Sequence, residues 1–138
     1  MKISLVLLIA WLMALNSDGA SAEVVAVVSA QSTITALSPT EIADIFLGKR
    51  ARLPGGGTAV PIDQAEDSPE REEFYVRYAG RTPVEMKMHW SKLIFTGRGQ
   101  PPRQVRDAEA VKAALAAQPN AIGYLDRRYV DESLTVLE

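Results

Sequence analysis

Residues 37–50 read LSPTEIADIFLGKR, and this stretch specifies an amphipathic helix with a clear start and a clear end. Ser38 can cap the first turn, Pro39 suits the first helical position, and Glu41 can complete a capping box. Gly48 follows as a C-terminal stop. The apolar positions recur with the period of a helix, at Ile42, Ile45 and Phe46.

Similar helix-start signals recur along the rest of the chain. Ser68-Pro69 and Thr82-Pro83 each start a helix in the same way, and an Ala-rich helix is expected over residues 107–118. The alternation of helices with apolar runs predicts an α/β sandwich with a mostly parallel sheet. The runs expected to form strands are residues 24–29, 60–62, 121–125 and 134–137.

The helix that starts at Thr82 is expected to run to about residue 95. Its first apolar face carries Met86, Trp90, Leu93 and Ile94, and its second carries Val84, Met88 and Phe95. A helix that is apolar on two faces is predicted to be well buried. The aromatic side chains expected in the core are Tyr75, Tyr78, Trp90 and Phe95.

The chain begins with the features of a secretory signal peptide. Lys2 precedes an apolar run over residues 3–15, and the small residues Ala20-Ser21-Ala22 close the segment. We therefore expect residues 1–22 to be a cleaved signal peptide and residues 23–138 to form one periplasmic domain. A retained membrane anchor is the alternative, but the apolar run is shorter than the roughly 20 residues that a span requires.

The bulk composition excludes some classes of partner and chemistry. The net charge of −2 gives no reason to expect nucleic acid or an anionic membrane as a partner. The chain has no Cys, which excludes disulfides, thiol chemistry and thiolate metal sites. Absence of Cys fits a periplasmic protein but decides little about location by itself.

The sequence offers little for catalysis. The single His, His89, makes a zinc site poor, and its polar helix face indicates an ordinary surface histidine. A small hydrolase is therefore the weakest of the functions considered. A carboxylate cluster could bind a cation, but it matches no calcium loop, so turn chemistry is favoured. The cluster consists of Asp63, Glu66 and Asp67.

Two glycine-containing loops could approach an anion. Backbone N–H groups at Gly97 and the side chain of Arg98 could form a small anion nest, and residues 54–57 (PGGG) form the second loop. Neither matches a nucleotide-binding motif, so ordinary turns are the simpler interpretation. Arg98, Arg103 and Arg106 also make a basic strip, for which a solvated loop is the simpler explanation.

Four phrases in order give the chain a family resemblance: IFLGK at 45–49, DSPEREEF at 67–74, Trp90 with FTG at 95–97, and AIGYL at 121–125. Together they resemble the small standalone members of the phosphate-type periplasmic binding protein superfamily, over nearly all of residues 24–125. The resemblance implies a type-2 periplasmic-binding-protein-like fold, a three-layer α/β sandwich. Full binding proteins close two such lobes over a ligand, whereas this chain has the length of about one lobe.

The resemblance also implies a ligand site, in which phosphate binders use an Arg and the run Asp-Gly-Ser-Gly-Thr, followed by an aromatic residue. Aligning that Ser with Ser68 places Phe74 at the aromatic position, Gln64 at the Arg position and Glu70 at the Thr position. Only Ser68 keeps its ligand-contacting type. Loss of Arg removes a bidentate clamp, Glu70 adds negative charge, and Pro69 removes a backbone donor. The remaining motif positions hold Glu66 and Asp67.

These features predict an exported, non-catalytic, solute-binding-protein-like domain with weak or altered anion binding, related to the phosphate-binding component of ABC transporters. The alternative is a periplasmic interaction or accessory module that has lost ligand binding. The partners considered are a small anion such as phosphate and a membrane or periplasmic protein, with no cofactor and no metal. The oligomeric state stays open. The candidate ligand-binding residues are Ser68, Gln64, Glu70, Gly97 and Arg98.

Overall fold

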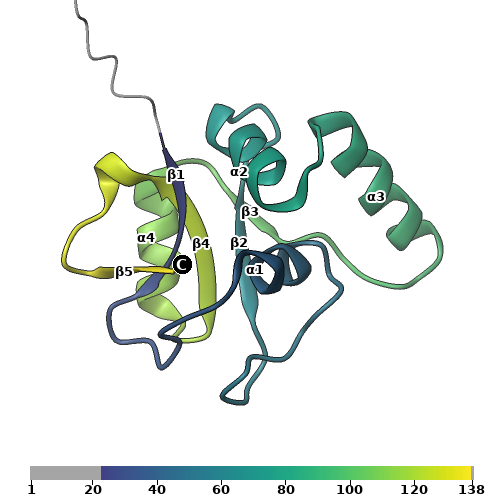
Figure 1. The fold of residues 1–138 in the computed structure, drawn as a ribbon. Coiled ribbons are helices and arrows are strands. Elements are labelled where there is room, and N and C mark those ends of the chain that lie inside the picture. The colour runs from purple at the N-terminus through teal and green to yellow at the C-terminus, as the bar shows by residue number, and fades with distance from the viewer. Residues whose placement is uncertain (1–22, 138) are drawn as a thin grey trace, which may run out of the picture.

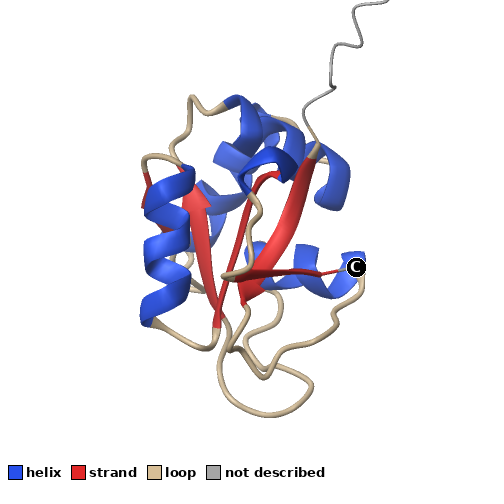
Figure 2. Ribbon diagram, turned by 90° about the vertical axis from the view of Figure 1, so that its left-hand side faces the viewer, coloured by secondary structure: helices blue, strands red, loops and turns tan. Residues whose placement is uncertain are grey.

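The computed structural model describes residues 23–137, which form a five-stranded sheet between two layers of helices (Figures 1 and 2). The predicted signal peptide, residues 1–22, lies outside the described residues. From residue 23 to residue 137, no helix is long and apolar enough to cross a membrane. In chain order the elements are β1 (Val24–Ser29), α1 (Pro39–Phe46), β2 (Val60–Gln64), α2 (Pro69–Ala79), α3 (Pro83–Phe95), β3 (Arg103–Val105), α4 (Ala108–Ala117), β4 (Ala121–Asp126), the 3-10 helix η1 (Arg127–Tyr129) and β5 (Leu134–Leu137).

The α/β fold class predicted from the sequence is confirmed, but only two of the four strand pairings are parallel. The strand order is β3-β2-β4-β1-β5. Strand β2 runs parallel to β3 and β4, whereas β1 runs antiparallel to β4 and β5. The sheet is therefore mixed instead of mostly parallel. An apolar run indicates that a strand is buried on both faces but does not indicate its direction. Strand β1 is buried in this way although both of its neighbours are antiparallel.

Alternating side chains of the sheet supply two cores. On one face, Val24, Ala26 and Val28 of β1 pack with the residues of α1, α2 and α3, and on the other face Val25 and Val27 pack with α4. Figure 2 shows α4 on one side of the strands and α1 on the other. The sheet is thus the middle layer of a three-layer sandwich, as predicted.

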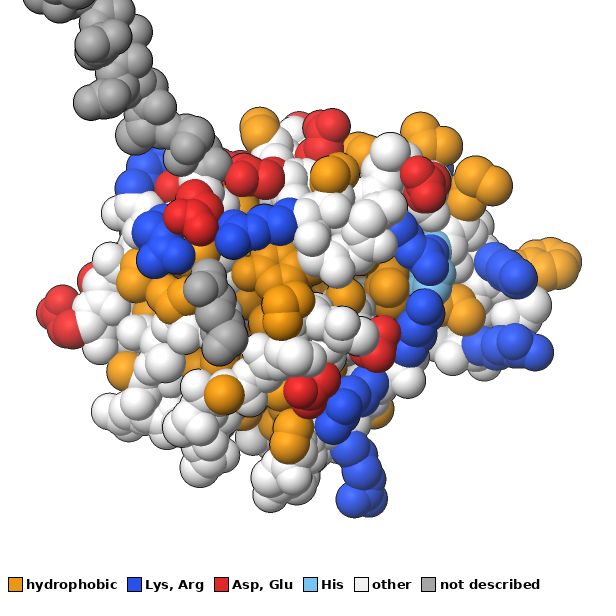
Figure 3. Space-filling view, viewed as in Figure 1, with side chains coloured by type: hydrophobic (Ala, Val, Ile, Leu, Met, Phe, Trp, Pro, Cys, Tyr) orange, Lys and Arg blue, Asp and Glu red, His pale blue; other side chains and the backbone are white. Residues whose placement is uncertain are grey.

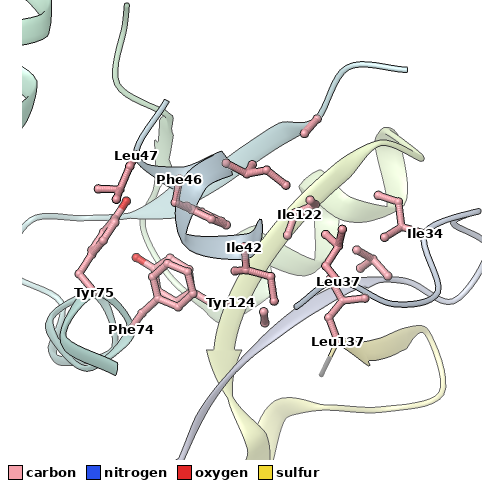
Figure 4. Packing of buried hydrophobic residues seen from close by; sticks show 14 of the residues in the cluster. Ile34, Leu37, Ile42, Phe46, Leu47, Phe74, Tyr75, Ile122, Tyr124 and Leu137 are labelled. Atoms are coloured by element: carbon pink, nitrogen blue, oxygen red, sulfur yellow. The ribbon is translucent and has the colours of Figure 1, made fainter. Parts of the chain in front are cut away.

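Aromatic rings fill the larger core (Figure 4). The rings of Phe74 and Tyr124 are stacked with centroids 4.0 Å apart, and Phe46 meets Phe74 edge-on at 4.7 Å. Such aromatic pairs add about 0.5–1.5 kcal/mol beyond the burial of their area. This cluster fastens α1 and α2 to β4.

The helix starts are confirmed as predicted. Ser38 Oγ accepts from the N–H of Glu41 while the Glu41 carboxylate accepts from the N–H of Ser38, which completes the capping box. Ser68, Thr82 and Asp107 cap the other three helices in the same way through their side chains. Each cap contributes about 1 kcal/mol and fixes where its helix begins.

Helix α3 is less buried than its sequence predicts. Met86 and Trp90 are buried against the larger core, but Met88 is 67% exposed and Phe95 is 92% exposed. The expectation of a well-buried helix, with Phe95 in the core, was wrong. Figure 1 shows the physical reason: α3 lies at the side of the domain, so nothing in the described chain covers its outer face.

Strand β3 is an element that the sequence pattern did not reveal. It has only three residues, within a stretch expected to be a loop, and pairs Arg103 with Ile62 of β2. Its side chains are mostly exposed, so it carries no apolar run. Parallel pairing with β2 places it at the edge of the sheet.

Candidate functional site

The three parallel strands β2, β3 and β4 end at the same edge of the sheet, and a pocket of about 300 Å³ lies there. Gln64 ends β2, Arg106 follows β3, and Asp126 ends β4. Helices α2 and α4 begin at the same edge, with Ser68 among the lining residues. In open α/β sheets, ligands bind outside the carboxyl ends of the strands. We call this cavity the Ser68 pocket.

Three of the predicted site residues meet in the Ser68 pocket. Ser68 Oγ lies 3.1 Å from Gln64 Oε1 and 2.9 Å from Glu70 Oε2, and it accepts a hydrogen bond from the N–H of Arg71. The single hydroxyl proton is therefore already directed at oxygens of the protein. The Glu70 carboxylate therefore lies beside the start of α2, within hydrogen-bond distance of the Ser68 hydroxyl.

Gln64 is held firmly within the fold. Its side-chain Nε2–H donates to the backbone carbonyl of Tyr124 at 2.9 Å, and its backbone N–H donates to Asp63 Oδ1 at 2.8 Å. The side chain is almost completely buried. Its remaining amide oxygen faces Ser68, so Gln64 offers an acceptor and not a positive charge at this position.

Carboxylates dominate the charge of the Ser68 pocket. Its lining includes Asp67, Glu70, Asp107 and Asp126, against the single cation Arg106. Arg106 is itself 3.7 Å from Asp107, in a highly exposed ion pair. The Asp126 Oδ2 atom has no hydrogen-bond partner among residues 23–137, although Arg128 Nε lies 3.3 Å away. This balance disfavours a multiply charged anion.

Gly97 and Arg98 lie away from the Ser68 pocket and end α3. Gly97 has φ +67° and its N–H donates to the carbonyl of Ile94, while the N–H of Arg98 donates to the carbonyl of Leu93 at 2.8 Å. These bonds satisfy the last carbonyls of the helix, the usual task of glycine after a C-cap. The backbone groups expected to form an anion nest are thus engaged in capping.

The single histidine also has a structural task. His89 Nε2 lies 2.8 Å from the carbonyl oxygen of Leu47, so Nε2 carries the proton, and Nδ1 lies 3.0 Å from Arg81 Nη1. These contacts tie α3 to the end of α1. No group of three His, Cys, Asp or Glu residues in the described part of the chain could hold a metal ion.

A buried polar cluster around Asp63 is the feature that sequence reasoning missed. Asp63 Oδ2 accepts from the Tyr75 hydroxyl at 2.7 Å and lies 3.4 Å from Arg71 Nε, while Oδ1 accepts from the Tyr124 hydroxyl. Burial, with the Asp63 charge adding to it, raises the pKa of both tyrosines above the ordinary value, so both remain donors. The i, i+4 spacing of Arg71 and Tyr75 on one helix was the available signal.

Comparison with known proteins identifies the same architecture in solved structures. No family model and no curated protein matches the chain. The chain is similar to a protein assigned as a phosphate ABC transporter substrate-binding protein from Clostridium perfringens, with bound phosphate, at 20% identity and TM-score 0.67. It is also similar to an ABC-type phosphate transport receptor from Vibrio cholerae (14%, TM-score 0.65) and to PstS from Borrelia burgdorferi (14%, TM-score 0.58).

The fold is similar to part of these solved substrate-binding proteins. The alignments cover 85% of this chain but only 44–47% of the three solved structures, so the chain spans less than half their length. This confirms the predicted resemblance and the predicted α/β sandwich. At 14–20% identity the likeness establishes the fold alone.

Proposed function

We propose that the protein is an exported, non-catalytic, solute-binding-protein-like domain that binds phosphate weakly, because its own Glu70 carboxylate occupies the anion position. The contact that carries this proposal is the Ser68 hydroxyl, which lies 2.9 Å from Glu70 Oε2. An incoming phosphate would have to displace that carboxylate. Two like charges about 4 Å apart repel by roughly 1 kcal/mol in water and by roughly 4 kcal/mol near a protein surface.

Export and the absence of catalysis rest on separate observations. Export is supported by the signal-peptide features of residues 1–22, and periplasmic location by the class of the fold neighbours. A non-catalytic role is supported by the same neighbours and by His89, which contacts Arg81 beyond the C-terminal end of α2, whereas Ser68 caps the other end of that helix.

The proposal is tested by measuring phosphate binding with isothermal titration calorimetry on the full chain and on Glu70 variants. E70T restores the residue type that the resemblance places at this position, and E70Q keeps the size and hydrogen-bonding capacity while removing the charge. We expect both variants to bind phosphate on the order of tenfold or more tightly than the parent chain. S68A is the matched control that should abolish the gain.

Tight phosphate binding by the parent chain, lost in S68A, would show that Glu70 does not block the Ser68 pocket. An E70Q variant that binds no better than the parent chain would show that charge is not the obstacle. Thermal unfolding of every variant without ligand provides the check that each one is folded.

An interaction module is a second candidate, and the outer face of α3 favours it. The exposed apolar side chains on this helix are Val84, Met88, Ile94 and Phe95, the last of them 92% exposed. Figure 3 shows orange and blue side chains side by side over α3. Large exposed apolar side chains gathered on one element are typical of a contact surface. Analytical ultracentrifugation of the parent chain and F95S, over a range of concentrations, would detect self-association through this face.

A further inference from the structure

A second pocket, of about 360 Å³, lies between α3 and the carboxyl end of β2, and it shares no lining residue with the Ser68 pocket. Its buried lining residues are Asp63, Arg71, Met86 and Trp90. We call it the Arg71 pocket. Cavities of this size, about 300 Å³ upward, are large enough to take a small molecule.

Arg71 brings unused hydrogen-bonding capacity to this pocket. Its side chain is only 8% exposed, its Nε lies 3.4 Å from Asp63 Oδ2, and its guanidinium lies 5.0 Å from the Tyr75 ring centroid. Within residues 23–137, Nη1 and Nη2 have no hydrogen-bond partner, yet neither atom is sealed from solvent. Because these two nitrogens are open to solvent, they are available to a partner from outside the chain, either water or a ligand.

Asp63 does not use up this capacity. Its two oxygens also accept hydrogen bonds from the N–H of Gln64 and from the hydroxyls of Tyr75 and Tyr124. The carboxylate is thereby satisfied with only one contact to Arg71. The terminal nitrogens of Arg71 form the planar, two-pronged donor that matches a carboxylate.

The charges that line the Arg71 pocket decide which anion fits. Arg71 and Lys87 are cationic, whereas Asp63 and Glu66 are anionic, so the formal charges cancel. A multiply charged anion such as phosphate gains little there. A monoanion needs only the local donors of Arg71.

The apolar walls of the Arg71 pocket favour a ligand whose remaining part is apolar. Met86 and Trp90 form a buried apolar wall, and Ile94 stands at the rim with 55% of its surface exposed. The Trp90 Nε1–H has no hydrogen-bond partner among the described residues. An apolar body against this wall would cover the exposed side of Ile94 and gain the free energy of apolar burial.

We propose that the Arg71 pocket binds a small organic monocarboxylate, with the carboxylate on Arg71 and the apolar body between Trp90 and Ile94. This site differs from the Ser68 pocket in position and in ligand class. It can therefore be present whether or not the Ser68 pocket binds phosphate.

The test uses hexanoate as the probe, with hexylammonium and hexanol as matched probes of opposite and zero charge. The 15N-labelled full chain is titrated with each probe, and the NMR signals of Arg71 Nε–H and Trp90 Nε1–H are followed. A W11F variant distinguishes the Trp90 signal from that of the only other tryptophan. We expect hexanoate to shift both signals with saturation in the millimolar range, and hexanol to bind on the order of tenfold more weakly.

Two variants assign the binding to the pocket. R71K keeps the charge but loses the two-pronged donor, and should weaken hexanoate binding by roughly tenfold or more. I94S changes a rim residue that is 55% exposed, so the fold should tolerate it, and it should weaken binding several-fold. E70Q, which acts on the Ser68 pocket, should leave hexanoate binding unchanged.

Three results would overturn the proposal. Hexylammonium binding as tightly as hexanoate would show that Asp63 and Glu66 govern the pocket. Failure of hexanoate to shift either signal up to its solubility limit would show that no monocarboxylate site exists. Unchanged hexanoate affinity in I94S, together with unchanged affinity in a folded R71K, would place the binding elsewhere.

Discussion

Removal of the Asp63 carboxylate should destabilise the fold severely. In D63A the hydroxyl of Tyr75 loses its acceptor, and the Arg71 side chain, 8% exposed, loses the carboxylate with which it forms an ion pair. Breaking a buried ion pair by removing one partner costs about 3–5 kcal/mol. Since small domains are stable by about 5–15 kcal/mol in total, this loss is a large fraction of the stability.

The matched variant R71M isolates the role of the tyrosines. In R71M, Asp63 still accepts hydrogen bonds from Gln64, Tyr75 and Tyr124, so we expect a smaller loss of about 1–3 kcal/mol. The free energy of unfolding is measured by urea titration with far-UV circular dichroism, and an unchanged m-value confirms that only stability differs.

The order of the two variants is the decisive result. If R71M loses more stability than D63A, the ion pair, and not the tyrosine hydroxyls, holds the carboxylate in place. If D63A loses less than about 1 kcal/mol, the ion pair of Asp63 and Arg71 contributes no more than an exposed surface ion pair.

Three further predictions follow from other contacts. Stability should fall as pH rises above about 10, by about 1.4 kcal/mol per pH unit for each tyrosine: folded Tyr75 and Tyr124, whose pKa is raised, keep protons that the unfolded chain loses. The two tyrosines contribute fully to the free energy of unfolding below their pKa in the unfolded chain, and that contribution is lost as pH rises above it. Urea titrations of Y75F/Y124F across this range should therefore show a flatter decline in the free energy of unfolding. G123A should cost about 1–3 kcal/mol in the same assay, since the new Cβ would lie 2.8 Å from Val111 Cγ1, and V111A should recover part of the loss in a double-mutant cycle; purely additive losses would contradict this. F95S should change the unfolding free energy by no more than about 0.5 kcal/mol, because Phe95 is 92% exposed, and a larger loss would mean that α3 is packed more closely than described.

Local features of the molecule could be predicted from the sequence. The capping box of Ser38 and Glu41 closes within four residues, so its hydrogen bonds depend on little outside that turn. The apolar run of β1 was enough to predict a buried strand. The phrases shared with phosphate binders were enough to predict the fold found among the solved structures.

The candidate sites depended on contacts between distant segments. The sequence indicated Ser68, Gln64 and Glu70 through the family resemblance, but not that Glu70 would take the hydroxyl of Ser68. It did not indicate the Arg71 pocket, because no motif connects Arg71 to Trp90 on the next helix.

The sequence by itself determined where the helices begin and which runs are buried, since caps and apolar periodicity act over a few neighbouring residues. Tertiary structure alone decided the direction of β1, the exposure of Phe95 and the joining of Asp63 to Tyr124, which lie 61 positions apart. The physical reason is that burial and long-range hydrogen bonds depend on which surfaces other segments cover. Those surfaces exist only once the chain has folded.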